Sequence, residues 1–158
     1  MVNISVIGGS KINDTTCKIA IEVGRLLAER GVTVVCGGLG GVMECVAKGV
    51  KEMGGIAIGI LPGSDPGDGN KYLTAAIPTG IGYARNFLVV RAGKVAIAID
   101  GSTGTLSEAS FAIAEGKNVV AIGDLVIQPK KEKEGKFFKV NTAREAVDLA
   151  IELASGVS

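Results

Sequence analysis

Short apolar runs alternate with longer segments of helical period along most of the chain. The apolar runs are rich in β-branched residues and bounded by glycines, which is typical of buried strands; they lie at residues 2–7, 32–36, 56–61, 73–77, 95–99 and 119–122. Helical spacing of apolar residues predicts a first helix that begins after Asp14 or Thr15 and ends at residues 29–31, and further helices at 42–53, 83–92, 103–115 and 143–154. Strands that alternate with helices predict an α/β fold with a mostly parallel sheet.

Local signals mark where several of these elements begin and end. Asp14 or Thr15 is the expected N-cap of the first helix, Gly31 ends it, and Thr142 opens the last helix with a capping box. Residues 62–70 hold Pro, Gly, Ser and Asp without periodicity and predict a loop beside the ligand edge of the sheet. The charge-dense residues 130–136 predict a solvated loop or hairpin without a function.

Length and composition limit the classes of protein that fit. The chain has 158 residues, 47% of them hydrophobic and 21% charged, so we expect one globular domain over residues 1–158. The net charge is +1 without a long block of one sign, which argues against a nucleic-acid partner and against docking on an anionic membrane. An anionic ligand would have to be bound by local groups.

The cysteines and the absence of targeting signals indicate a compartment. Cys17, Cys36 and Cys45 are odd in number, show no CxxC spacing and sit in apolar stretches, so we interpret them as unpaired core residues in a reducing environment. No leader pattern or unbroken apolar run of membrane-spanning length is evident. The expectation is a cytoplasmic protein, and the lack of histidine gives no reason to propose a metal site or a bound cofactor.

Two glycine-rich turns should lie at the carboxyl edge of the sheet, where helix N-termini offer free N–H groups to anions. The first is Gly8-Gly9-Ser10. The second packs four glycines into five positions before a helix, and its candidate ligand-binding residues are Gly37, Gly38, Gly40, Gly41 and Met43. This turn has neither the GxGxxG order of a dinucleotide site nor the GK[ST] of a P-loop. The alternative for these glycines is close packing of strand against helix.

A third turn, residues 100–108, combines small and hydroxyl-bearing residues at the start of a helix. Its candidate phosphate-binding residues are Gly101, Ser102, Thr103, Gly104 and Thr105. Glu108 lies one turn into the helix, and Arg85 reaches the same edge from the neighbouring turn, so both are candidate catalytic residues. Their structural alternatives are a carboxylate that stabilises the helix dipole and an arginine on a solvated helix face.

Residues 37–43 resemble the GGGxxGLM motif of the LOG-like family, also called lysine decarboxylase-like, and residues 101–108 resemble its PGGxGTxxE motif. The spacing from Arg85 to Glu108 is also similar to that of the family's arginine and glutamate. The resemblance implies a Rossmann-like three-layer sandwich with helices on both faces, and a homo-oligomer, commonly a dimer. The chain departs from the family pattern at Asp100 in place of proline, Ser102 in place of glycine and Asn86 in place of lysine.

The resemblance implies two functions for a small phosphate-bearing ligand, and they stay open at this stage. One is a nucleoside 5′-monophosphate phosphoribohydrolase that cleaves the N-glycosidic bond, with Glu108 acting at the sugar and Arg85 orienting the substrate. The other is a binding protein without turnover, such as a carrier of the molybdenum cofactor, which has a pterin ring, or a nucleotide sensor. A DNA-binding module is disfavoured by the near-zero net charge.

Overall fold

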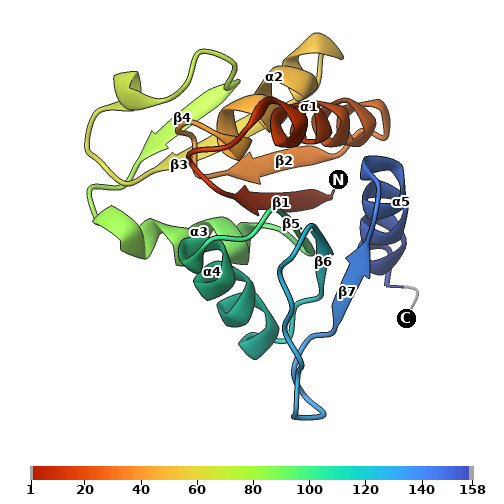
Figure 1. The fold of residues 1–158 in the computed structure, drawn as a ribbon. Helices are drawn as coiled ribbons and strands as arrows, with labels where there is room; N and C mark the ends of the chain where they lie inside the picture. Colours follow the sequence, from red (N-terminus) through yellow and green to blue (C-terminus); the bar gives the residue numbers. More distant parts are fainter. Residues whose placement is uncertain (1, 157–158) are drawn as a thin grey trace.

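The computed structural model describes residues 2–156, and its strands form one parallel sheet (Figure 1). The strands are β1 (Asn3–Gly8), β2 (Thr33–Cys36), β3 (Ala57–Leu61), β4 (Ala75–Pro78), β5 (Ala96–Ile99), β6 (Val119–Ile122) and β7 (Phe137–Val140). The α-helices are α1 (Asp14–Glu29), α2 (Val42–Glu52), α3 (Arg85–Ala92), α4 (Thr103–Ala114) and α5 (Ala143–Ala154). Two 3₁₀ helices, η1 (Pro66–Asp68) and η2 (Gly82–Ala84), lie in the connections.

The sheet is seven-stranded, in the order β4-β3-β2-β1-β5-β6-β7, and all neighbouring strands are parallel. The chain builds outward from β1 to β4 and then crosses back to place β5 on the other side of β1. A crevice forms at the carboxyl ends of the strands where the direction of winding reverses, and ligands of open α/β sheets bind there. In this fold that point lies between β1 and β5.

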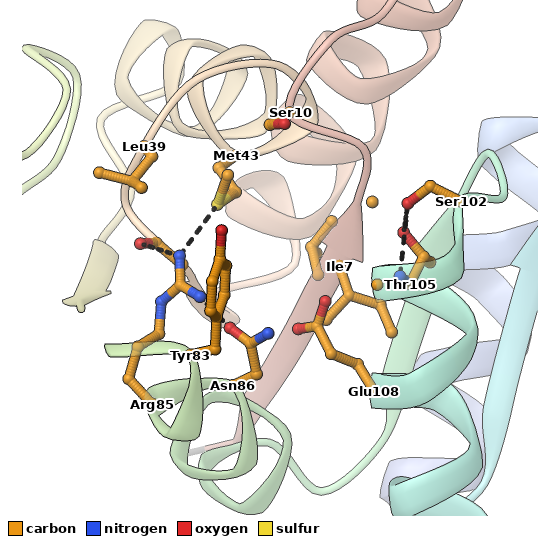
Figure 2. Close-up of a pocket in the computed structure, with 14 residues that line it drawn as sticks. Ile7, Ser10, Leu39, Met43, Tyr83, Arg85, Asn86, Ser102, Thr105 and Glu108 are labelled. Carbon is orange, nitrogen blue, oxygen red and sulfur yellow. Dashed lines mark hydrogen bonds between the residues drawn. The ribbon is translucent and has the colours of Figure 1, made fainter. Parts of the chain in front are cut away.

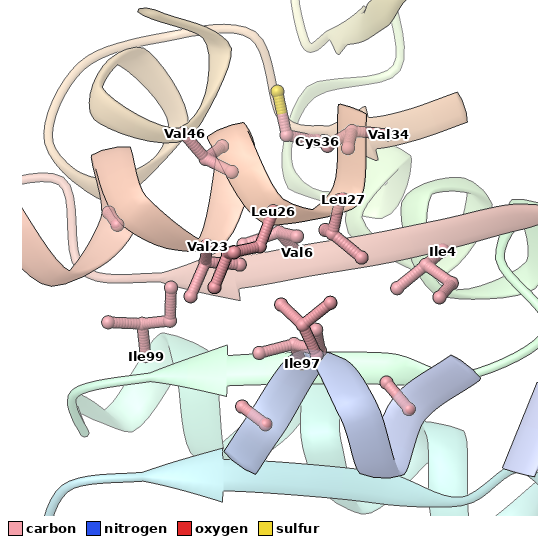
Figure 3. Packing of buried hydrophobic residues seen from close by; sticks show 14 of the residues in the cluster. Ile4, Val6, Val23, Leu26, Leu27, Val34, Cys36, Val46, Ile97 and Ile99 are labelled. Carbon is pink, nitrogen blue, oxygen red and sulfur yellow. The ribbon is translucent and has the colours of Figure 1, made fainter. Parts of the chain in front are cut away.

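Helices cover both faces of the sheet, with α1, α2 and α5 on one face and α3 and α4 on the other (Figure 1). Alternate residues of the central strands supply the two cores: Ile97 and Ile99 of β5 pack with α1 and α5, whereas Ala96 and Ala98 face α3 and α4. Figure 3 shows the larger core between α1 and the strands. Burial on both faces explains why these strands have near-continuous apolar sequences.

The predicted fold class is confirmed: the structure is a Rossmann-like three-layer α/β sandwich. The predicted helices and six predicted strands are present, with boundaries shifted by a few residues. β7 was not predicted, because it is a short edge strand that follows the charged loop of residues 130–136 and buries its side chains only in part. The predicted N-caps of α1 are wrong: the cap is Asn13, whose side chain accepts a hydrogen bond from the N–H of Thr16 at 2.8 Å.

The expectation of three unpaired cysteines is also wrong. Cys17 in α1 and Cys45 in α2 form a disulfide, and only Cys36, which is buried, is free. The two partners are 28 residues apart, so the spacing in the sequence gave no sign that the helices bring them together. The cysteines therefore no longer support a reducing compartment. Within residues 2–156, no helix has the length and apolar character to cross a membrane.

Candidate functional site

A cavity of about 230 Å³ lies at the carboxyl end of β1, where the winding of the sheet reverses (Figure 2). Its walls come from the turns after β1 and β2, from the start of α3 and from the first turns of α4. The lining residues are Val6, Ile7, Gly8, Ser10, Gly37, Leu39, Met43, Tyr83, Arg85, Asn86, Ser102, Gly104, Thr105 and Glu108. Pockets that enclose whole drug-sized ligands measure roughly 300–1,000 Å³. This cavity is therefore sized for part of a ligand, such as its phosphate and the group attached to it.

The N-terminus of α4 offers unpaired hydrogen-bond donors to this cavity. Ser102 is the N-cap, and its hydroxyl accepts from the N–H of Thr105 at 3.4 Å. The N–H groups of Thr103 and Gly104 have no partner within the part of the chain that the structure describes. A Cβ added at Gly104 would have Ser102 Oγ as its nearest neighbour, at 4.0 Å. The first turn of α4 therefore leaves both free donors and free space, as an anion site requires.

The glycines of the turn after β2 mostly serve packing. A Cβ at Gly37 would lie 2.5 Å from Met43 Sδ and 2.9 Å from Arg85 Nη2. Gly41 has a φ of 67° and would place a Cβ 2.2 Å from the carbonyl oxygen of Gly9. Gly38 is similarly enclosed, whereas Gly40 has no atom closer than 3.8 Å. Close packing thus explains Gly37, Gly38 and Gly41, and their role as ligand contacts stays a prediction.

Arg85 is 6% exposed and is anchored mainly to the protein itself. Its Nε donates to the carbonyl of Ile60 at 2.9 Å, its Nη2 donates to the carbonyl of Gly37 at 3.3 Å, and its Nη1 donates to Asn86 Oδ1. Nη2 also donates to Met43 Sδ at 4.0 Å, so four of the five N–H donors of the guanidinium have acceptors and one remains. Burial lowers the pKa of Arg85, and Glu108 opposes that change. Arg85 therefore ties the ends of β2 and β3 together and supplies positive charge to the cavity.

Glu108 reaches from α4 toward the cavity from the side opposite Arg85 (Figure 2). It is half-buried and makes neither a hydrogen bond nor an ion pair with any residue from 2 to 156. Burial raises its pKa to about 7, and the charge of Arg85 acts in the opposite direction. A carboxyl group with this pKa exchanges a proton near neutrality, which suits it to acid–base chemistry or to proton-linked binding.

The turn before α4 has an unusual backbone at Asp100, whose φ of 65° is the one positive value at a non-glycine residue in the described chain. Its Oδ1 accepts from the N–H of Gly101 at 2.8 Å. Proline cannot adopt a positive φ because its ring fixes φ near −65°. Asp100, which stands where the LOG-like motif has proline, therefore gives this turn a backbone path that the motif's proline would not allow.

Most, but not all, of the site residues proposed from the sequence line the cavity. Of those, Gly8, Ser10, Gly37, Met43, Arg85, Ser102, Gly104, Thr105 and Glu108 line it, and Gly9, Gly38, Gly40, Gly41, Gly101 and Thr103 do not. Tyr83 and Asn86 line it and were not proposed as site residues. Tyr83 is an aromatic residue that directly follows Gly82, two positions before Arg85, and that position was the signal that could have identified it.

Comparison with known proteins identifies the family of this chain. The sequence profile of the SLOG cluster4 family matches residues 1–147. The chain belongs to this family. The SLOG superfamily also includes the LOG-like proteins, in agreement with the resemblance of the two motifs. The chain is also 39% identical over 127 residues to an uncharacterized protein of Archaeoglobus fulgidus, a match that covers 80% of this chain and 83% of that protein.

Several solved structures have a fold similar to that of this chain. The molybdenum cofactor binding protein of Rippkaea orientalis is 28% identical, with a TM-score of 0.86 and 96% of each chain covered. The molybdenum cofactor carrier protein of Chlamydomonas reinhardtii is 25% identical, with a TM-score of 0.83 and 99% of each chain covered. DNA processing protein A of Helicobacter pylori, at 17% identity and a TM-score of 0.68 over 97% of this chain and 81% of that one, shares the fold.

Proposed function

We propose that this protein binds a small molecule with a phosphate group and a planar ring and holds it without turnover, as a carrier holds its cargo. The observation that carries the proposal is the pair of free N–H groups of Thr103 and Gly104 at the first turn of α4, where Gly104 lines the cavity at the reversal point of the sheet. These donors and the helix dipole suit a phosphate. The phosphate of a nucleotide and that of a pterin-type cofactor would be bound in the same way.

Two features favour binding over catalysis. Four of the five N–H donors of Arg85 are already used within the protein, so the guanidinium is not free to follow a reacting group. Two of the similar structures are described as binding or carrying the molybdenum cofactor. That cofactor would be the cargo, with its phosphate at α4. No group of three or more His, Cys, Asp or Glu that could hold a metal ion occurs in residues 2–156, so the pterin would have to carry the metal.

Mass spectrometry of the small molecules that co-purify with the protein tests this proposal. We expect an intact compound with a phosphate group, either a pterin or a nucleotide, which is absent from a Gly104→Val preparation that folds normally. Recovery of no phosphate-bearing compound, together with no change in melting temperature when AMP, GMP or sulfate is added, would refute it.

Glu108 favours a second candidate function, the hydrolysis of nucleoside 5′-monophosphates. Its unpaired carboxyl, with a pKa raised to about 7 by burial, could stabilise an oxocarbenium-like sugar or activate water. We would incubate the protein with AMP and GMP and measure the free base by chromatography. Base release that disappears in Glu108→Gln would establish hydrolysis, and its absence with both nucleotides would leave the carrier function.

We also propose a homo-oligomer on the basis of an exposed apolar surface near the site. Large apolar side chains of β4, of the residue before η2 and of α3 are exposed, namely Ile77, Ile81 and Leu88. Such clusters mark interfaces in soluble proteins. Light scattering during gel filtration should give a dimer or larger assembly, and a monomer at high protein concentration would contradict it. Nucleic acid stays disfavoured by a net charge of +1, and a salt-sensitive gel shift with single-stranded DNA would reverse that view.

A further inference from the structure

A second hollow lies against the cavity, between the start of α3 and the first turns of α4. Its volume is about 270 Å³, and it is lined by Tyr83, Ala84, Asn86, Phe87, Ser107 and Glu108. Tyr83, Asn86 and Glu108 line both spaces, so these side chains stand at the junction between them. The two spaces are therefore adjoining compartments that share a wall of these three side chains.

The second compartment differs from the first in its chemistry. The first is lined at the start of α4 by Gly104, whose N–H is free, and by the hydroxyl-bearing Ser102 and Thr105, whereas the second is lined by Tyr83 and Phe87. Phe87 is fixed in place because its ring packs on Phe111, with 4.4 Å between the ring centroids. Tyr83 is 87% exposed, and its hydroxyl makes no hydrogen bond with the described residues, so its ring is free to turn onto a ligand. A fixed ring beside a movable ring suits a flat aromatic group.

The polar groups of the second compartment could bind the edge of such a ring. Asn86 Oδ1 accepts from Arg85 Nη1, which fixes the amide and leaves its NH₂ free to donate. Ser107 adds a hydroxyl that has no partner among residues 2–156. Gly104 and Ser107 are one helical turn apart, about 4.5 Å along the axis at 1.5 Å per residue. A ring in this compartment would therefore lie one short linker away from a phosphate at the N-terminus of α4.

We propose that the hollow between Phe87, Tyr83 and Ser107 is the subsite for a flat heteroaromatic ring, either a purine or a pterin, of the same ligand whose phosphate lies at α4. This inference rests on the proposed binding function and adds to it the position of the ring and the residues that select it. Tyr83 and Phe87 supply stacking, and Asn86 and Ser107 supply hydrogen bonds to the ring edge.

Titration calorimetry with ring-bearing and ring-free phosphates tests the inference. AMP and GMP are compared with ribose 5-phosphate, and chromatography after each titration checks that the nucleotide is intact. Stacking on one aromatic side chain contributes enough to raise affinity about tenfold or more. We expect AMP or GMP to bind at least about tenfold more tightly than ribose 5-phosphate. Tyr83→Ala and Phe87→Ala should each lose most of that difference while binding ribose 5-phosphate as the wild type does.

The chain offers a matched control and a direct optical signal. Leu88, the neighbour of Phe87 on α3, is 39% exposed and lines neither compartment, so Leu88→Ala should bind AMP like the wild type. The protein has two tyrosines and no tryptophan, so Tyr72→Phe leaves Tyr83 as the sole tyrosine emitter. In that variant AMP or GMP, but not ribose 5-phosphate, should quench the emission of Tyr83. Circular dichroism confirms that each variant is folded.

The outcomes separate the subsite from the anion site. If AMP and GMP bind no more tightly than ribose 5-phosphate, or if Tyr83→Ala and Phe87→Ala leave nucleotide affinity unchanged, the ring subsite is refuted while phosphate binding stands. Equal losses for AMP and ribose 5-phosphate would show that the two aromatic residues support the fold of the site and do not contact a ring. If none of these compounds binds and no phosphate-bearing compound co-purifies with the protein, the proposed function itself fails.

Discussion

Protonation of Glu108 should be coupled to the binding of an anion in the cavity. The carboxyl lies one helical turn beyond the free N–H of Gly104, and no described residue pairs with it. Burial already raises its pKa to about 7 against the charge of Arg85. A bound dianion adds a like charge at short range, which raises the pKa of Glu108 further. Binding above neutral pH should therefore draw a proton into the site.

The sign and size of the effect follow from linkage. Since the pKa of Glu108 is higher in the complex than in the free protein, affinity is greatest below the free value of about 7 and falls as the pH rises through it. If the bound dianion raises that pKa by about two units, affinity at about pH 8 is roughly tenfold lower than at about pH 6. The fall ends once the pH exceeds the pKa of the complex.

Calorimetry with sulfate isolates this effect, because sulfate stays dianionic throughout the neutral range and adds no titration of its own. Titrations in two buffers of different ionisation enthalpy count the protons taken up. We expect up to about one proton per sulfate at about pH 8 in the wild type. Glu108→Gln should take up none and bind with an affinity independent of pH. Glu115→Gln is the matched control, since Glu115 is at the far end of α4 and pairs with Arg91 at 2.6 Å.

Two results would refute the coupling. One is sulfate affinity in the wild type that does not change between about pH 6 and about pH 8. The other is a pH dependence that persists unchanged in Glu108→Gln, which would assign the proton to another group. Sulfate that fails to bind at every pH would instead contradict the anion site itself.

Three further predictions concern the scaffold. Gly104→Val should stay folded, because a Cβ there meets nothing closer than 4.0 Å, but it should lose affinity for sulfate. Gly41→Val should lower the melting temperature severely, because its Cβ would lie 2.2 Å from a backbone oxygen. Opening the Cys17–Cys45 disulfide, by reduction or by serine at both positions, should cost about 3–4 kcal/mol in urea unfolding, and an unchanged midpoint would contradict this. Lys117→Met should cost about 1–3 kcal/mol by the same measurement, since the ammonium donates to three carbonyls at the end of α3, and wild-type stability would argue against that role.

The sequence by itself determined the layers, the helices and the edge of the sheet that carries the site. Period-two and helical patterns identify elements because burial on a sheet or helix face imposes those periods locally. The candidates Arg85, Gly104 and Glu108 could be named because residues that directly follow parallel strands meet at one edge. β7 escaped prediction because a short, half-buried edge strand imposes little pattern on its sequence.

Only the tertiary structure decided what each of these residues can do. The position of β5 beside β1 brings the start of α4 to the cavity, and contacts between distant segments pair Cys17 with Cys45. In the folded chain Arg85 donates to the carbonyls of Ile60 in β3 and of Gly37 after β2, and Glu108 is unpaired among residues 2–156 with a pKa that burial raises to about 7. Hydrogen-bond partners, desolvation and free space depend on atoms far away in the chain. Local sequence patterns therefore do not predict these properties. The second compartment, too, is formed by the packing of α3 against α4.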